Sequence, residues 1–254
     1  MVTNVTTWTS LIQQFLSVFT QPTGVIFSRL TVGWILCTVR RTVTAMLPFG
    51  DPANHSAHDA YHRFLPDGHW KMAGLWRILT GILITMFCRN GMITLALDDT
   101  LFHRSGKKVN GAGYWRDAVR STRTNMVYAW GLNLVVVTLQ IQPPWGGEPL
   151  GLPINMRLHH KGGATLIELA QQMINEVIEW LPKRRFRVVA DGFYASLAGK
   201  ELPGVTIISR IQRNAEIYDL PKQPKKKTRG WPRKKGPRLL CPEKMAPMFV
   251  IGGK

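Results

Sequence analysis

The sequence predicts a mixed α/β protein, in which a helical N-terminal region precedes a mixed β-sheet with flanking helices. Two patterns carry this prediction. Apolar residues recur at helical spacing through residues 1–90, whereas after Gly91 short runs rich in β-branched and aromatic residues alternate with helical stretches. A chain of 254 residues with 45% hydrophobic content can also bury a sizeable core.

The helical region contains long segments such as "SRLTVGWILCTVRRTVTAML" and a polar connection, "FGDPANHSAHDAYHRFLPDGHW". Within the connection Ser56 is placed to cap a short helix, because Asp59 follows three residues later. His58 and His62 would share one face of that helix. This spacing suits a metal ion only if a third ligand is present, and solvated loop histidines are the more ordinary interpretation.

After Gly91 we expect three strands, a helix, a strand, a helix and a strand. The first three strands fall at residues 93–97, 126–141 and 150–158, and the first helix covers residues 165–181. The run "RFRVVA" forms the next strand, a helix starts near Ser196, and "GVTIISRI" forms the last strand. Three strands that can pair antiparallel, followed by alternating helix and strand, indicate a mixed sheet.

Composition divides the chain into three regions. Residues 1–90 are the helical region and residues 91–216 the sheet with its helices. Residues 217–254 are rich in Lys, Arg, Pro and Gly and are too polar to pack, so we expect either a basic arm or the start of an inserted β region.

The charge balance indicates a polyanionic partner. The chain has 33 Lys and Arg against 15 Asp and Glu, a formal charge of +18 and a pI near 10.4. The longest apolar run, residues 78–88, is about half of a membrane span, and the N-terminus lacks a signal-peptide pattern. The three cysteines lack metal-ligand spacing and fit a reducing cytoplasm. These features favour DNA as the partner over a membrane surface.

Carboxylates follow two of the expected strands. Asp98 and Asp99 come directly after the first strand, and Asp191 comes after the fourth. If these strands are parallel neighbours, their ends meet at one sheet edge, where like charges repel unless a cation lies between them. Mg²⁺ or Mn²⁺ prefers such oxygen ligands and promotes displacement at phosphorus. A strand end or turn is the structural alternative, and one of the adjacent pair must point away.

Two groups of cations are candidate DNA contacts, because Lys and Arg bind phosphates and release counterions. One follows the first acidic pair and the other lies in the C-terminal region, where solvated loop charge is the alternative. They are Arg104, Lys107, Lys108, Arg116, Arg120 and Arg123 in the first group, and Lys225, Lys226, Lys227, Arg229, Arg233, Lys234, Lys235 and Arg238 in the second.

The ordered motifs "LALDDTLFHRSGKK", "VYAWGLNLVVVTLQI", "LPINMRLHHKGGATLIELAQQMI" and "VVADGFYAS" resemble the catalytic core of DDE transposases from bacterial insertion sequences. The resemblance covers about residues 91–240 and implies a ribonuclease H-like fold. It implies Mg²⁺- or Mn²⁺-dependent cleavage and transfer of double-stranded DNA at insertion-sequence ends, by a homodimer in the bacterial cytoplasm and nucleoid. It makes Asp191 the second catalytic acid and either Asp98 or Asp99 the first, and it slightly favours Asp98.

The third acid of that family is a Glu on a late helix, beyond an inserted β region. Glu201, Glu216 and Glu243 are present, but none has the strand-then-helix context that this Glu needs. We therefore expect the core to be C-terminally incomplete, and the protein to bind DNA without nicking or joining it. The two interpretations left open are an incomplete or inactive transposase and a non-catalytic DNA-binding protein derived from one.

Overall fold

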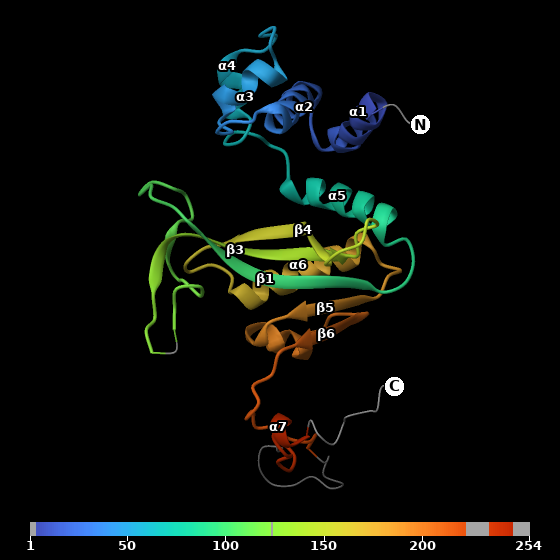
Figure 1. Ribbon diagram of the computed structural model, residues 1–254, viewed down its shortest axis with the longest axis vertical. Helices are drawn as coiled ribbons and strands as arrows, with labels where there is room; N and C mark the ends of the chain where they lie inside the picture. The colour runs from blue at the N-terminus through green and yellow to red at the C-terminus, as the bar shows by residue number, and fades with distance from the viewer. Residues whose placement is uncertain (1–3, 123, 222–233, 246–254) are drawn as a thin grey trace. The chain divides into compact units, whose positions relative to one another are not determined.

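The computed structural model describes residues 4–122, 124–221 and 234–245, and the chain forms two compact units, residues 1–90 and 91–254 (Figure 1). In the described residues, helices come first and a mixed sheet of six strands follows. The mixed α/β class expected from the sequence is therefore confirmed. None of the described helices is long and apolar enough to cross a membrane.

The first unit is a set of helices around a small aromatic core. Buried Ile26, Tyr61 and Phe64 form its centre, and the ring of Phe64 stacks on that of Trp70 with centroids 5.4 Å apart. Its elements are α1 (Asn4–Phe15), the 3₁₀ turn η1 (Leu16–Val18), α2 (Gln21–Leu36), α3 (Val43–Gly50), α4 (His58–Arg63) and α5 (Met72–Phe87).

The crossing of α2 and α3 depends on a missing side chain. A β-carbon on Gly33 would lie 2.6 Å from the carbonyl oxygen of Met46, closer than real contacts allow. The long helical segment expected here is split in two, because α2 ends at Leu36 and α3 begins at Val43. The hydroxyl of Thr42 caps α3 by accepting the Ala45 N–H at 3.2 Å.

The expected cap at Ser56 is wrong. The N-cap of α4 is Ala57, which makes no side-chain capping bond. Ser56 instead donates its N–H to the buried carboxylate of Asp51 at 3.0 Å and accepts from Arg29 Nη1 at 2.7 Å. A buried carboxylate needs hydrogen-bond donors, and this demand outweighs the local capping preference.

The second unit is built on a mixed sheet in the order β2-β3-β1-β5-β6, with β4 paired to β3. β3 pairs antiparallel with β1, β2 and β4, while β1 and β5, and β5 and β6, are parallel. The strands are β1 (Ile93–His103), β2 (Gly113–Arg116), β3 (Tyr128–Ile141), β4 (Leu150–His159), β5 (Phe186–Ala190) and β6 (Val205–Ser209).

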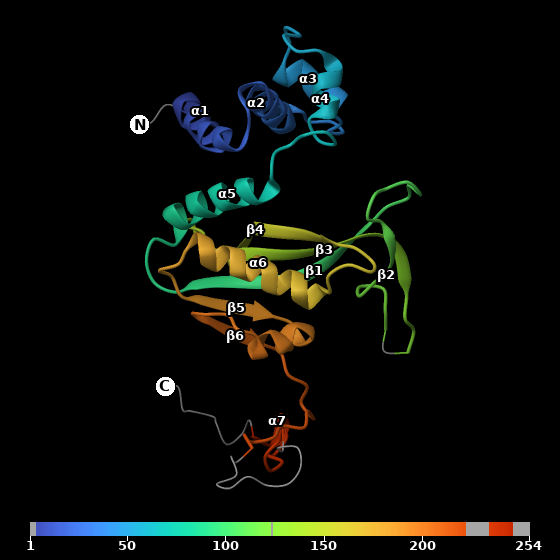
Figure 2. The same cartoon turned by 180° about the vertical axis from the view of Figure 1, so that it is seen from behind.

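Helix α6 (Leu166–Trp180) lies along one face of this sheet (Figure 2). It buries Leu169, Met173 and Val177, and a capping box that joins Thr165 and Glu168 starts it. The 3₁₀ helix η2 (Gly192–Gly199) follows β5, and the short helix α7 (Pro242–Met245) lies near the end of the described chain.

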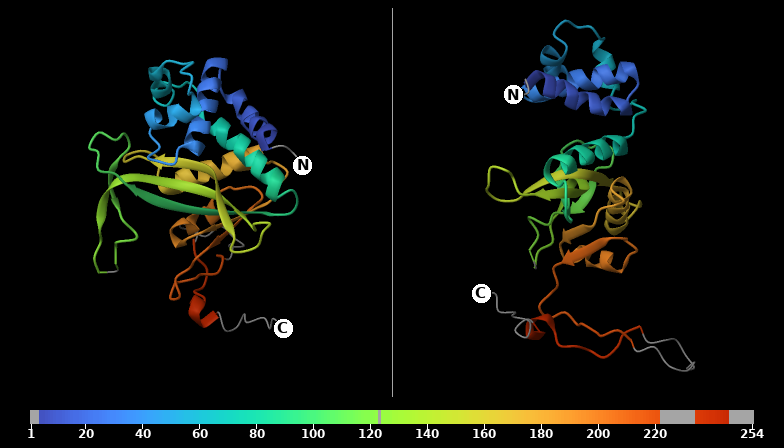
Figure 3. Two further views of the ribbon diagram at one scale, coloured as in Figure 1. Left: turned by 45° about the horizontal axis from the view of Figure 1, so that its top comes forward. Right: turned by 90° about the vertical axis from the view of Figure 1, so that its right-hand side faces the viewer.

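Three elements differ from the sequence prediction. β1 does not end at Leu97 but runs to His103, because its antiparallel pairing with β3 continues after its parallel pairing with β5 has stopped. Strand β2 is absent from the sequence prediction. The helix expected near Ser196 is the 3₁₀ helix η2 and begins at Gly192. Figure 3 (left) shows that β1 and β3 continue beyond β5. Together with β2 this continuation forms an extension of the sheet, called the strand extension below.

Candidate active site

The first feature of the site is the register of the two parallel strands that carry its acids. Leu97 and Ala190 are the last paired residues of β1 and β5, so Asp98 and Asp191 occupy the next equivalent positions. Partial desolvation raises the pKa of Asp98, and the charges of Asp99 and Asp191 raise it further. The structure therefore brings these carboxylates close enough for their charges to repel.

Asp98 and Asp99 lie inside β1 rather than beyond it, and they point to opposite faces. Leu95 and Leu97 are buried, and alternation along the strand puts Asp99 on their face. Asp98 is exposed on the other face, where its Oδ1 accepts the Asp99 N–H at 2.9 Å.

A tyrosine that the sequence did not single out holds Asp99. Tyr194 in η2 is fully buried, and its hydroxyl donates to Asp99 Oδ1 at 3.1 Å. Burial raises the Tyr194 pKa far above its usual value, and the charges of Asp99, Asp98 and Asp191 add to that shift. The hydroxyl therefore stays protonated and remains a donor. Its one sequence signal is its position three residues after Asp191, one turn of a 3₁₀ helix.

Asp191 also has a structural task. As the N-cap of η2, it accepts the Phe193 N–H at 2.9 Å through Oδ1. Its carbonyl oxygen accepts the Ser209 hydroxyl at 2.6 Å. The cap orients the carboxylate at the strand end and leaves Oδ2 as the remaining atom for a ligand.

His159 lies close enough to Asp99 for the carboxylate charge to act on its imidazole. Burial lowers the His159 pKa, an effect that the charge of Asp99 only partly offsets. Its ring packs on that of Trp115 with centroids 4.5 Å apart, and its buried Nδ1 lacks a hydrogen-bond partner among the described residues. His159 is therefore neutral near pH 7 and does not neutralise the acids.

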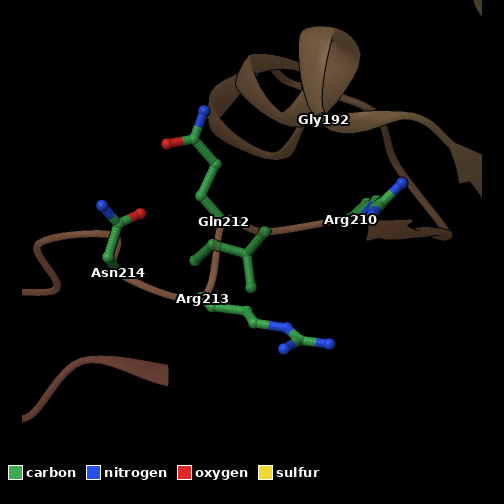
Figure 4. Close-up of a pocket in the computed structure, with 6 residues that line it drawn as sticks. Gly192, Arg210, Gln212, Arg213 and Asn214 are labelled. Atoms are coloured by element: carbon green, nitrogen blue, oxygen red, sulfur yellow. The ribbon is translucent and has the colours of Figure 1, made fainter. Parts of the chain in front are cut away.

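A polar pocket of about 750 Å³ lies beside Asp191, at the end of the sheet where β5 and β6 finish. Gln212 extends toward η2, and two arginine side chains lie on the same connecting segment (Figure 4). No sequence motif predicts this pocket, although ligands often bind beyond the carboxyl ends of parallel strands. Its lining residues are Gly192, Arg210, Ile211, Gln212, Arg213 and Asn214.

The first predicted cation group lies on the extension formed by β1, β2 and β3. Its described members are all exposed. Arg120 Nε lies 3.5 Å from the buried carboxylate of Asp117, which also contacts His103 at 2.9 Å. The described members are Arg104, Lys107, Lys108, Arg116 and Arg120, whereas Arg123 lies outside the described residues.

The second predicted cation group is described only in part. Arg238 forms an ion pair with Glu216 at 3.0 Å, and Lys235 lies over the ring of Tyr218 at 4.5 Å. Lys234 is exposed. The members outside the described residues are Lys225, Lys226, Lys227, Arg229 and Arg233.

The donor set fits a hard divalent ion in kind. Asp98 and Asp191 offer carboxylate oxygens, the ligands that Mg²⁺ and Mn²⁺ prefer, and water and phosphate can complete such a shell. In the described part of the chain, no group of three or more His, Cys, Asp or Glu side chains is arranged to hold a metal ion. The pair His58 and His62 therefore has no third ligand among these residues. Glu216 is engaged by Tyr218 and Arg238.

Comparison with known proteins identifies the family of the chain. The family model described as DDE superfamily endonuclease matches residues 14–247. No curated protein and no solved structure matched the chain.

Proposed function

The chain belongs to the DDE superfamily endonucleases, and from that premise we propose that it is a DNA transposase of the insertion-sequence type. The reaction is cleavage of double-stranded DNA at the ends of the element, followed by transfer of the freed 3′ end to target DNA. Members of this superfamily generally use divalent metal ions. The observation that carries the proposal is the equivalent position of Asp98 and Asp191, each directly after the last paired residue of two parallel neighbouring strands.

In this proposal Asp98 and Asp191 bind the divalent ion, Mg²⁺ or Mn²⁺. When bound, such an ion polarises the scissile phosphate and makes water a better nucleophile at neutral pH. Asp99 is a positioning residue, because the Tyr194 hydroxyl holds it toward the core. Its charge stays close enough to strengthen the field at Asp98.

Positive side chains position the DNA. Arg210 and Arg213 line the pocket beside Asp191 and would bind phosphates next to the scissile bond. Arg104 and Arg116 on the strand extension would bind DNA phosphates farther from the scissile bond. Water attacks the scissile phosphodiester and displaces the 3′-oxygen at the end of the element, which leaves as a 3′-hydroxyl. This 3′-hydroxyl then attacks a phosphodiester of the target, loses its proton and displaces the 3′-oxygen of the target strand. This work takes place on DNA in the bacterial cytoplasm and nucleoid.

The test compares metal binding and DNA cleavage in the same variants. Thermal unfolding of the full chain should shift upward with Mg²⁺, because a ligand that binds only the folded state stabilises it. Asp98→Asn and Asp191→Asn should lose that shift and any cleavage, whereas Glu179→Gln, an exposed acid on α6, should keep both. An unchanged Mg²⁺ shift in both aspartate variants would refute the ligand assignment.

A second candidate, a non-catalytic DNA-binding protein derived from a transposase, is favoured by one observation. The described residues do not supply a group of three metal-binding side chains. Strong DNA binding without cleavage in Mg²⁺ or Mn²⁺ would support this candidate. Cleavage that depends on Asp98 and Asp191 would exclude it.

A further inference from the structure

Four aromatic side chains share one face of the strand extension, and we call them the aromatic face: Phe102, Tyr114, Tyr128 and Trp130. Residues opposite each other in antiparallel strands lie on the same face. Tyr114 is paired with Trp130, and Arg116 with Tyr128. Phe102 is paired with Leu132, two residues beyond Trp130, and therefore lies on this face as well.

The aromatic face is continuous with the face that carries Asp98. Side chains alternate along β1, so Asp98, Thr100 and Phe102 all point the same way. The pairing of β1 with β3 runs unbroken from Asp98 to His103. Four residues of strand cover roughly 13 Å, so Phe102 lies a few nucleotide lengths from the acid.

Three of these four rings are exposed although they are large, and Trp130 is half-buried. Tyr114 is 60% exposed, Tyr128 61% and Phe102 44%, and the Tyr114 ring meets that of Trp130 edge-on with centroids 5.3 Å apart. The opposite face of the same strands is filled: Trp115 packs on His159. An aromatic cluster that the fold leaves uncovered marks an interaction surface.

The charge around the rings favours a nucleic acid as the partner. Arg116 stands directly opposite Tyr128 on this face, and the Arg104 N–H bonds the carbonyl oxygen of Trp130. Lys107 and Lys108 follow in the adjoining loop and are exposed. Exposed rings between cations are the arrangement with which proteins bind single strands, the rings stacking on bases and the cations holding phosphates. A duplex keeps its bases stacked internally and would leave the rings unused.

We propose that the aromatic face binds unpaired nucleotides of the DNA on which the site acts. Tyr114 and Tyr128 stack on bases, and Arg104 and Arg116 bind the phosphates between them. This proposal rests on the proposed function, which places DNA next to Asp98. It adds that the DNA on this face is single-stranded. Stacking needs no divalent ion, so it can be tested separately from cleavage.

The test measures binding of a labelled oligothymidine of about 20 nucleotides and of a duplex of equal length, in EDTA, by fluorescence anisotropy. The double variant with Tyr114→Leu and Tyr128→Leu should bind the single strand about tenfold or more weakly. Its affinity for the duplex should change by less than about twofold. The double Tyr→Phe variant keeps the rings and should bind like the parent. Trp145→Leu, which removes a 76% exposed ring in the loop after β3, should have no effect.

A second measurement does not depend on the fold of a variant. Photo-crosslinking of the unaltered protein to an oligonucleotide that contains 5-iodouracil should label Tyr114 or Tyr128, because the reaction favours stacked aromatic rings. Equal losses on single and double strands, no loss in the Leu variant, or crosslinks confined to other residues would each overturn the proposal. Failure of cleavage alone would count only against the proposed function.

Discussion

Asp98 and Asp99 are covalent neighbours inside β1, yet Asp98 is exposed and Asp99 accepts a hydrogen bond from buried Tyr194. Hydrophobic runs in the sequence pointed to both acids and to Asp191, whose catalytic role stays a prediction. They could not point to Tyr194, because its partner lies 95 residues away along the chain. Only the turn of η2 after Asp191 brings the hydroxyl back to β1.

We predict that Asp98→Asn raises thermal stability when no divalent ion is present. The pKa of Asp98 is raised in the folded state, so its ionised form destabilises the fold, and neutralising it relieves repulsion. The gain should be on the order of 2 °C or less, because the residue is exposed to solvent. Differential scanning fluorimetry in EDTA measures it.

The pH dependence provides the control for this prediction. The gain should be full above the folded-state pKa and should vanish as the pH falls toward the ordinary Asp value of about 3.9, where the native carboxyl becomes protonated too. Glu179→Gln should produce no such pattern. A destabilised Asp98→Asn protein at neutral pH would contradict the repulsion argument.

A second residue-scale prediction concerns the buried carboxylate of Asp51. Burial disfavours its charge, but hydrogen bonds from Tyr61 at 2.6 Å, from His55 and from backbone N–H groups hold its pKa well below the usual value. Its contribution to stability is therefore full above about pH 3.9 and is lost as the pH falls through the lowered pKa. Asp51→Asn should destabilise the helical unit at neutral pH, as measured by calorimetry of the full chain.

Asp59→Asn is the matched control, because Asp59 is exposed and pairs with Arg63 at 2.6 Å on the surface of α4. It should change stability little. The difference in thermal stability between the parent and Asp51→Asn should shrink in acid. A difference that stays constant down to the lowest accessible pH would argue against the hydrogen-bonded carboxylate.

At the scale of elements, the sequence predicted β3, β4, β5, β6 and α6 close to their observed bounds, because their apolar periodicity is strong. It missed β2, four residues that start at a glycine and form no pattern of their own. It ended β1 too early because adjacent aspartates are unfavourable in strands, and pairing with β3 overrides that local preference.

The crossing of α2 and α3 yields a prediction at this scale. Gly33→Ala should destabilise the helical unit by about 1–3 kcal/mol or more, because the new methyl group meets the backbone of Met46. Gly81→Ala in α5 has open space around it and should stabilise by up to about 1 kcal/mol, because alanine favours helices. Chemical denaturation of both variants measures the contrast, and equal effects would contradict the close approach.

At the scale of the whole molecule, the charge of +18 was informative before any fold was known, since it pointed to a polyanion. The chain divides at residue 90 into two compact units, and the family match extends over parts of both. Composition could not reveal that several of these cations lie beside the aromatic face. That arrangement depends on the pairing of β2 with β3.

The salt dependence of DNA binding tests how this charge is used. Replacing the described cations of the strand extension with alanine should flatten the plot of log affinity against log salt by about 0.9 for each phosphate that is no longer neutralised. Lys183→Ala and Arg185→Ala, exposed cations before the start of β5, are the matched control. An unchanged slope would remove the extension from the interface. The substituted residues are Arg104, Lys107, Lys108, Arg116 and Arg120.

The alternation of buried and exposed side chains in β1 has a consequence for how the site is specified. A slip of β1 by one residue would exchange the faces of Asp98 and Asp99, but it would also turn Leu95 and Leu97 out of the core. The cost of exposing two leucines therefore fixes which carboxylate is exposed to solvent and which lies on the face of the core. The proposed choice of Asp98 over Asp99 as the metal ligand is thus enforced by apolar side chains of the core.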